Sequence, residues 1–278
     1  GKAARGHKMG IADHMGDARL MFKYSSKFNS SQRKQFDGYF KPRNEAFLAA
    51  NLQGDERTSW HYQRYIKNYL RCVQAVDENV GRLLAYLDKS GLAKDTVVIY
   101  SSDQGFYLGE HGWFDKRWIY DESLRTPLLA RWPGVTKPGS VNDSPVTSTD
   151  FFPTILEMAG VNPKLPLPTD GVSFTPALHG KKHDRGAMYW HYPHYGNQGG
   201  APTGAIREGD WKLVEWYENG RLELFNLKED ISEKNDLAKK QPDKVRILAA
   251  KLANWRKDTG AVMPALNEKF DPKKREGR

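Results

Sequence analysis

The chain has 278 residues, of which 43 are Lys or Arg and 34 are Asp or Glu, so its formal net charge is +9. A single cysteine excludes both an internal disulfide and a cysteine-based zinc site, and no apolar run approaches the roughly 18 residues that a membrane span needs. The length suffices for one large domain with a smaller satellite. We therefore expect a folded protein without a membrane span.

The excess of positive charge lies near the start of the chain. Residues 1–72 hold 14 basic and 6 acidic side chains, whereas residues 73–278 hold 29 and 28. Such a segment can attract a polyanion, but apolar residues interrupt it and no zinc-finger spacing accompanies it. A solvated face is the simpler interpretation, and nucleic acid is not expected as a partner. Because Gly1 opens a polar stretch without an initiator Met, we expect the N-terminal part to be missing.

The first half of the chain alternates between helical and strand patterns. Apolar residues recur every three or four positions over residues 62–87, which predicts a long amphipathic helix that ends before Gly91. The apolar run 96–102 is typical of a strand buried on both faces of a parallel sheet, and 126–132 is a second strand. Asp150 is then placed to begin a helix that ends at Gly160. The order predicts an α/β fold with a doubly wound sheet.

The second half carries shorter elements. Strands are predicted at 188–192, 205–207, 211–217 and 221–227, with hairpin turns before the third and fourth of them, and a final helix covers 245–255. This pattern indicates a small antiparallel sheet with one helix, followed by a Lys-rich tail from Phe270. We expect two domains, residues 1–180 and residues 181–278.

The polar residues that follow the first strand are the best candidates for chemistry. Ligands of open α/β sheets gather at the carboxyl ends of strands, where this chain has Ser-Ser-Asp-Gln-Gly over 101–105. Asp103 supplies a carboxylate and Gln104 a neutral carbonyl oxygen, a pair of hard ligands suited to Ca²⁺ or Mg²⁺. Two ligands fill neither ion's shell, so the rest would come from elsewhere in the fold. An ordinary strand-ending turn is the alternative.

The residues around this turn form longer motifs. They include Leu-Gly-Glu-His-Gly-Trp-Phe-Asp-Lys-Arg over 108–117, Leu-Arg-Thr-Pro-Leu over 124–128 and Ser-Thr-Asp-Phe-Phe-Pro-Thr over 148–154. Together with the Asp-Gln-Gly turn, they closely resemble the C-terminal half of type I, formylglycine-dependent sulfatases of the alkaline-phosphatase superfamily. The stretch 206–213 is similar to the small C-terminal sheet of the same family, so the resemblance covers nearly the whole chain.

The resemblance implies roles for several residues. It implies that Asp103 and Gln104 bind Ca²⁺, with Mg²⁺ as the second choice, and that Lys116 is a catalytic residue that contacts the sulfate. A cation is suited to that role because negative charge has to be held on sulfate oxygens while the S–O bond changes. The implied activity is hydrolysis of a sulfate ester of a carbohydrate, in a periplasmic or secreted protein, although the chain shows no signal peptide.

One part of the family pattern is absent. The family forms its formylglycine from the Cys or Ser of a Cys-x-Pro/Ala-x-Arg motif, whereas Cys72 is followed by Val-Gln-Ala-Val. We therefore expect formylglycine and the remaining metal ligands in a missing N-terminal half of the same fold, which is an implied partner. These 278 residues alone are expected to show no sulfatase turnover.

Histidines are the remaining site candidates. His111 lies inside the motif, in a loop that Gly109 and Gly112 predict to be tight, and its ring could serve either the loop's structure or the substrate. His191 and His194 belong to an aromatic segment, 191–195, which suits a sulfated sugar but could equally be an edge strand.

Two alternatives to a carbohydrate sulfatase remain. A phosphodiesterase or phosphonate hydrolase of the same superfamily would use a similar metal and cation. A polyanion-binding fragment without catalysis would explain the basic segment and the absent nucleophile.

Overall fold

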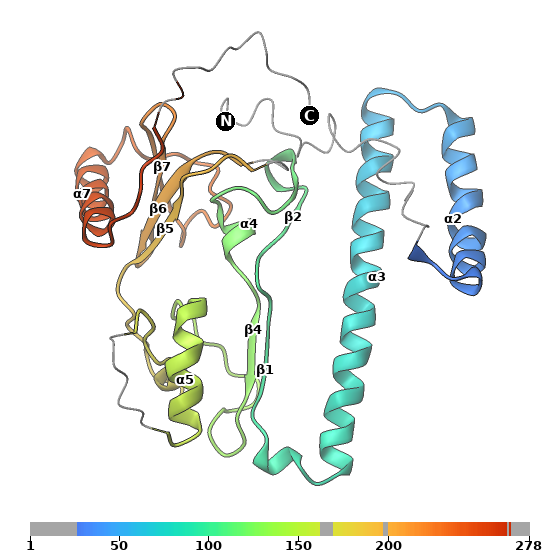
Figure 1. Cartoon of the computed structure of the whole chain (residues 1–278), viewed down its shortest axis with the longest axis horizontal. Helices are drawn as coiled ribbons and strands as arrows, with labels where there is room; N and C mark the ends of the chain where they lie inside the picture. Colours follow the sequence, from blue (N-terminus) through green and yellow to red (C-terminus); the bar gives the residue numbers. More distant parts are fainter. Residues whose placement is uncertain (1–26, 162–168, 197–199, 266, 268–278) are drawn as a thin grey trace. The chain divides into compact units, whose positions relative to one another are not determined.

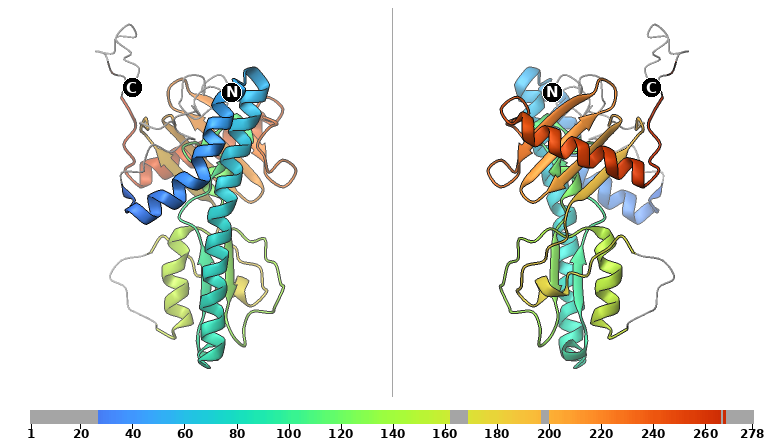
Figure 2. Two further views of the ribbon diagram at one scale, coloured as in Figure 1. Left: turned by 90° about the vertical axis from the view of Figure 1, so that its right-hand side faces the viewer. Right: turned by 90° about the vertical axis from the view of Figure 1, so that its left-hand side faces the viewer.

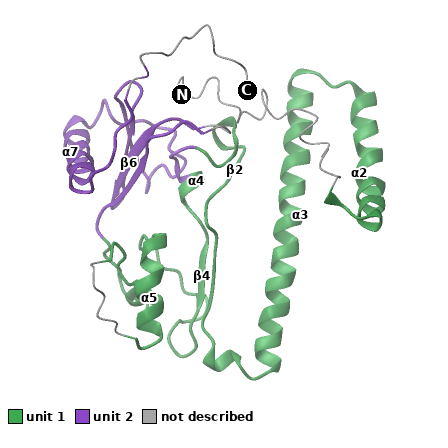
Figure 3. Cartoon of the chain, viewed as in Figure 1, with its two compact units in different colours: residues 1–117, 122–185 green, residues 118–121, 186–278 purple. Residues whose placement is uncertain are grey.

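The structure is a computed structural model, and it describes residues 27–161, 169–196, 200–265 and 267. The chain forms two compact units (Figure 3). Unit 1 comprises residues 1–117 and 122–185, and unit 2 comprises residues 118–121 and 186–278. A four-residue segment is thus separated in sequence from the rest of its unit. The domain boundary at residue 180 stays a prediction, and the tail from Phe270 lies outside the described residues.

The first helices that the structure describes in unit 1 are α2 (Ser30–Ala50) and α3 (Gly54–Lys89), joined as a hairpin (Figure 1). Phe47 of α2 stacks on Trp60 of α3 with ring centroids 3.7 Å apart, and Arg64 donates to Asn44 at 2.8 Å. We did not predict α2. Its start carries a sequence signal, because Asn29 and the Gln three residues later form a reciprocal capping box.

Helix α3 confirms the predicted amphipathic helix but begins at Gly54, earlier than the periodic pattern indicates. Several members of its apolar stripe stay exposed among the described residues. Leu70 is 54% exposed, Val76 46% and Leu83 55%. A contiguous exposed apolar face of this kind marks an interaction surface.

The strands of unit 1 form two-stranded antiparallel sheets. They are β1 (Val98–Ser101) paired with β4 (Leu128–Arg131), and β2 (Tyr107–Leu108) paired with β3 (Phe114–Asp115). Both predicted strand positions are confirmed. The expectation that the first is buried on both faces of a parallel sheet is not met within the described residues, because a pair has no central strand. Tyr100 and Leu129 accordingly remain exposed.

The predicted helix after Asp150 is confirmed as α5 (Phe151–Met158), although Asp150 acts differently from an ordinary N-cap. Its buried carboxylate accepts hydrogen bonds from the backbone of Thr147 and Val172, each at 2.9 Å, and from Arg185 at 2.7 Å. Asp150 therefore ties together three separate stretches of unit 1. Short helices of the unit include η3 (Ala93–Asp95), η5 (Ser148–Asp150), which leads into α5, and α6 (Thr175–Leu178).

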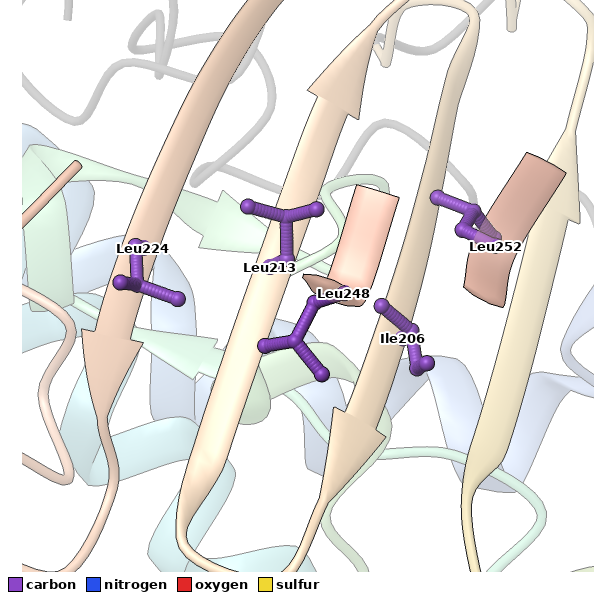
Figure 4. Packing of buried hydrophobic residues seen from close by; sticks show 5 residues of the cluster. All are labelled: Ile206, Leu213, Leu224, Leu248 and Leu252. Atoms are coloured by element: carbon purple, nitrogen blue, oxygen red, sulfur yellow. The ribbon is translucent and has the colours of Figure 1, made fainter. Parts of the chain in front are cut away.

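Unit 2 contains the predicted antiparallel sheet and helix. Its strands, in sheet order, are β5 (Met188–Tyr192), β6 (Thr203–Glu208), β7 (Trp211–Trp216) and β8 (Arg221–Asn226). Helix α7 (Pro242–Asp258) covers one face (Figure 2). The core between helix and sheet consists of Ile206, Leu213, Leu224, Leu248 and Leu252 (Figure 4).

The segment 118–121 packs against the face of the sheet opposite to α7. The side chains of that face alternate along the strands with those of the core. Side chains of a strand point alternately to the two faces, so Lys212 faces away from α7 while its neighbour Leu213 faces the helix. Lys212 is fully buried, with its Nζ 2.8 Å from Asp121 and 2.9 Å from Glu233. A buried cation flanked by two carboxylates is costly unless all three stay paired.

Glu233 should make the stability of the chain depend on pH. Its burial raises the pKa of its carboxyl to about 7, above the usual 4.5, despite the nearby Lys212. Between these pH values the folded state holds a proton that the unfolded state has released, so stability falls as the pH rises through this window. Glu233→Gln should flatten that slope. Melting temperatures of both proteins from pH 4.5 to 8 test this, and parallel curves would contradict it.

Candidate functional site

The predicted metal ligands lie on the turn that follows β1. Ser101 Oγ donates to the Pro127 carbonyl at 2.9 Å, which ties the end of β1 to the start of β4, and Ser102 Oγ donates to the Gln104 carbonyl at 2.8 Å. The Asp103 side chain is exposed, and within the described residues its carboxylate has only a contact of 3.4 Å from Ser102 Oγ. A turn held by two serine hydroxyls thus presents an exposed carboxylate.

Gly105 fixes the rear of this turn. Its N–H donates to the Ser123 carbonyl at 2.8 Å, in the short helix α4 (Asp121–Leu124). A Cβ at position 105 would lie 2.1 Å from the Glu122 carbonyl oxygen and 2.8 Å from that of Arg125. Both contacts involve backbone, which cannot turn away as a side chain could. Only glycine fits here, and its fit holds the Asp103–Gln104 turn against α4.

Gly105→Ala should therefore lower stability by roughly 2 kcal/mol or more, the upper range for a single strained substitution. The matched control is Gly38→Ala within α2, where an added Cβ meets nothing within 4 Å. It should stabilise slightly, because alanine is the better helix former. Denaturant unfolding of the two variants measures the contrast. Equal stabilities would show that the turn can move away from α4 at little cost.

The motif loop 109–117 is tight, as its glycines predict. Gly109, His111, Gly112 and Asp115 all have positive φ, with His111 at 55° and Asp115 at 75°. Residues 110–112 form the short helix η4 (Glu110–Gly112), and β3 follows directly. Non-glycine residues rarely adopt this conformation, and such strain persists where the surroundings over-determine the backbone. The loop is therefore built to a specific shape.

His111 is held by α4, the same helix that supports the Asp103–Gln104 turn. Its Nε2 lies 3.5 Å from Glu122 Oε1, and both side chains are mostly buried. The rings of Tyr107 and Trp113 lie near the imidazole. Glu122 thus serves two parts of the site, since its carbonyl faces Gly105 and its carboxylate faces His111. The sequence analysis singled out neither Glu122 nor Gly105.

Lys116 stands at the end of the β2–β3 hairpin, which α3 anchors. Tyr65 of α3 donates its hydroxyl hydrogen to the Tyr107 carbonyl at 2.8 Å, and burial raises the pKa of Tyr65, so it stays a donor. Phe114 packs against three aromatic side chains of α3. Lys116 itself is half-buried, and within the described part of the chain its ammonium has no ion-pair partner. A rigid hairpin therefore presents a cation that is available to an anion.

The residues present fit a partial shell for a hard divalent cation. Asp103 offers an exposed carboxylate and Gln104 an amide oxygen, the donor types that Ca²⁺ and Mg²⁺ prefer. No three His, Cys, Asp or Glu side chains of the described residues are grouped as a metal site. These two residues would thus supply one side of a shell that needs six or more oxygens for Ca²⁺.

The other two candidate histidines lie in unit 2 and differ from each other. Nε2 of His191 lies 3.0 Å from the Val262 carbonyl, which can only accept, so this nitrogen carries the hydrogen. Nδ1 then accepts from the Tyr217 hydroxyl at 2.7 Å. Both ring nitrogens are engaged. His194 is exposed beside Tyr192, with ring centroids 5.5 Å apart, so its ring is more accessible than that of His191.

Two family models match the chain. The sulfatase model matches residues 13–161, and the model for the C-terminal part of N-sulphoglucosamine sulphohydrolase matches residues 109–258. The chain belongs to the sulfatase family. That family uses formylglycine and a divalent metal, and the predicted fold class, an alkaline-phosphatase-like α/β part followed by a small antiparallel sheet with one helix, is confirmed.

Individual relatives also indicate the sulfatase family. The chain is 37% identical to an N-acetylglucosamine-6-O-sulfatase of Bacteroides thetaiotaomicron over 82% of its length, and spans 43% of that protein. It matches the structure of BT4656 in complex with its substrate D-glucosamine-2-N,6-O-disulfate with a TM-score of 0.83 and 33% identity, covering 99% of this chain and 59% of the other. A phosphonate monoester hydrolase of Agrobacterium radiobacter matches less well, with a TM-score of 0.55, 26% identity, and coverage of 66% of this chain and 39% of that one.

The chain thus spans about half the length of these relatives. Among the helices that the structure describes, none has the length and apolar character needed to cross a membrane.

Proposed function

We propose that this chain forms part of a sulfatase that hydrolyses a sulfate ester of a glucosamine-type sugar. The observation that carries the proposal is the double contact of α4, which supports both the Asp103–Gln104 turn and the loop that leads to Lys116. A metal-binding turn and a cation on one support are what an anionic ester requires. The named substrates of the relatives support the sugar class.

Asp103 and Gln104 would hold Ca²⁺, with Mg²⁺ as the second choice. The bound metal supplies positive charge that neutralises sulfate oxygens. Lys116 would direct its ammonium at the same oxygens and stabilise the charge that develops on them, the role of a preorganised cation. His111, held by Glu122, would donate a hydrogen bond to the ester group from a fixed position.

The segment that includes His191 and His194 would contact the sugar. His194 and Tyr192 offer exposed rings, on which a saccharide can stack, while His191 offers its ring face because its nitrogens are engaged. Contacts with the sugar and contacts with the sulfate would therefore come from different residues, and substrate choice would depend on the former.

The formylglycine nucleophile and the remaining metal ligands would come from the other half of the sulfatase fold. The exposed stripe of α3 and the exposed Tyr100 and Leu129 of the β1–β4 pair are apolar surfaces suited to contact that half. We keep residues 1–180 as the α/β part and residues 181–278 as the C-terminal domain. A periplasmic or secreted location is proposed from the family resemblance.

The test compares ester classes on the full-length protein that contains this chain. It should hydrolyse 4-nitrophenyl sulfate and 6-O-sulfated N-acetylglucosamine, with a far lower kcat/KM for the phosphonate monoester 4-nitrophenyl phenylphosphonate. A preference for the phosphonate would favour the alternative that the likeness to the Agrobacterium hydrolase supports. Binding of sulfated polysaccharide without any hydrolysis would favour the other alternative, a polyanion-binding protein without catalysis.

A further inference from the structure

The segment 118–121 is held far more firmly than a connecting loop requires. Its four side chains are all buried, at 3–6% exposed. Asp121 accepts from Lys212 Nζ at 2.8 Å, and its N–H donates to Glu233 at 2.6 Å. Arg207 lies 3.7 Å from the second oxygen of Asp121. Three strands or loops of unit 2 therefore fix the position of one residue.

A second polar group holds the same segment one residue earlier. The Tyr120 hydroxyl donates to Glu223 Oε2 at 2.8 Å, and that oxygen also accepts from the Trp216 indole at 2.9 Å. Arg221 completes the group with an ion pair of 2.8 Å to Glu223. The buried Glu223 carboxylate, held by Trp216 and Arg221, therefore fixes Tyr120. Both clusters thus act on 118–121.

This segment is covalently continuous with both parts of the candidate site. Lys116 lies two positions before Trp118, and Glu122 directly follows Asp121. Glu122 in turn faces Gly105 with its carbonyl and His111 with its carboxylate. A displacement of Asp121 would therefore move the supports of Lys116, His111 and the Asp103–Gln104 turn together.

We propose that Lys212 is a positioning residue, whose buried ion pairs with Asp121 and Glu233 fix the segment 118–121 and thereby the placement of Lys116 and Glu122. Its ammonium is fully buried and touches no substrate; it acts through Asp121. The catalytic part of this inference rests on the proposed function, whereas the claim that Lys212 fixes the segment does not.

The first test needs no substrate. In the full-length protein, Lys212→Met should speed amide hydrogen exchange in peptides covering 103–124 by roughly 10-fold or more, because the carboxylates lose their cation and the segment opens more often. Peptides from β6 and α7 should remain protected, which shows that the unit is still folded. Lys251→Met, which removes an exposed ion pair with Glu208 in the same unit, is the control and should change neither.

The second test is kinetic. Lys212→Met should lower kcat for sulfate esters by roughly 10-fold, with little change in KM, since misplacement of a charge-stabilising group weakens the transition state most. In a Lys116→Ala background the same substitution should cost less, because one of the groups that it positions is gone. Independent, additive losses would overturn the positioning role. Absence of sulfatase activity in the parent protein would overturn only the proposed function.

Lys212→Met could also fail to fold. The triple variant Lys212→Met, Asp121→Asn, Glu233→Gln removes the uncompensated carboxylates along with the cation, so it should keep the sheet folded. It should still show faster exchange in 103–124 and a reduced kcat. Parental exchange and parental kcat in this variant would overturn the proposal.

Discussion

Replacing Lys116 by alanine in the full-length protein is expected to lower kcat/KM by roughly 10²-fold for every sulfate ester, the scale of losing one preorganised charge-stabilising donor. Lys116 ends a hairpin that α3 anchors through Tyr65, and the described residues offer its ammonium no ion-pair partner. Since the sulfate group is common to all substrates, the loss should not depend on the sugar. Steady-state kinetics on an aryl sulfate and on a sulfated glucosamine measure it.

His194→Ala provides the contrast. An exposed ring that contacts only the sugar should matter for the saccharide and leave the small aryl ester unaffected, because remote binding groups act only on substrates that reach them. Equal losses on the aryl ester for the two variants would assign His194 to the chemistry or to the fold. A Lys116→Ala protein that kept its aryl-sulfate activity would remove Lys116 from the site.

Asp103→Asn should weaken metal binding and activity together. The substitution preserves the size of the side chain and removes its charge, and the charge count of the ligands sets Ca²⁺ affinity. Activity should then require a higher metal concentration, by roughly 10-fold or more, for half-maximal rate. Calorimetric titration of the metal-free protein with Ca²⁺ measures the affinity without turnover.

The control for Asp103 is Asp77→Asn, an identical change at an exposed position of α3. It should leave the titration and the activity unchanged. If Asp103→Asn bound Ca²⁺ like the parent, the turn after β1 would be an ordinary strand end, as the alternative holds. A stronger response to Mg²⁺ than to Ca²⁺ in the parent would reverse our choice of metal.

The sequence predicted those elements whose stability is decided locally. The period of α3, the hairpin turns between β6, β7 and β8, and the stripe of α7 are all patterns of neighbouring residues. Helix α2 was missed because its aromatic residues are interspersed with basic ones and form no clear stripe. Its capping box, at Asn29, was the available signal. The pairing of β1 depends on which strands are present, and no local pattern encodes that.

The candidate site likewise contains residues that local motifs predict and residues that they do not. Motifs drew attention to Asp103, Lys116 and His111, because these residue types at this spacing are distinctive. The residues that support the site could not be predicted in this way. Gly105 matters because its Cα approaches the carbonyl of Glu122, more than fifteen positions away. Lys212 is buried against residues 91 and 21 positions distant, so strand alternation alone describes it as an ordinary charged residue. Long-range partners decide its burial.

The interruption of unit 2 by residues 122–185 of unit 1 has a consequence for folding. Hydrogen bonds from 118–121 span 91, 103 and 112 residues, whereas the hairpins of the sheet are local. High contact order slows folding, so we expect early hairpins and a late, rate-limiting insertion of this segment. An excised fragment that begins at Gly186 would lack Asp121 and Tyr120, expose Trp216 and leave Lys212 with one carboxylate, and it should aggregate. Dissection of this protein for expression should therefore retain both stretches in one polypeptide.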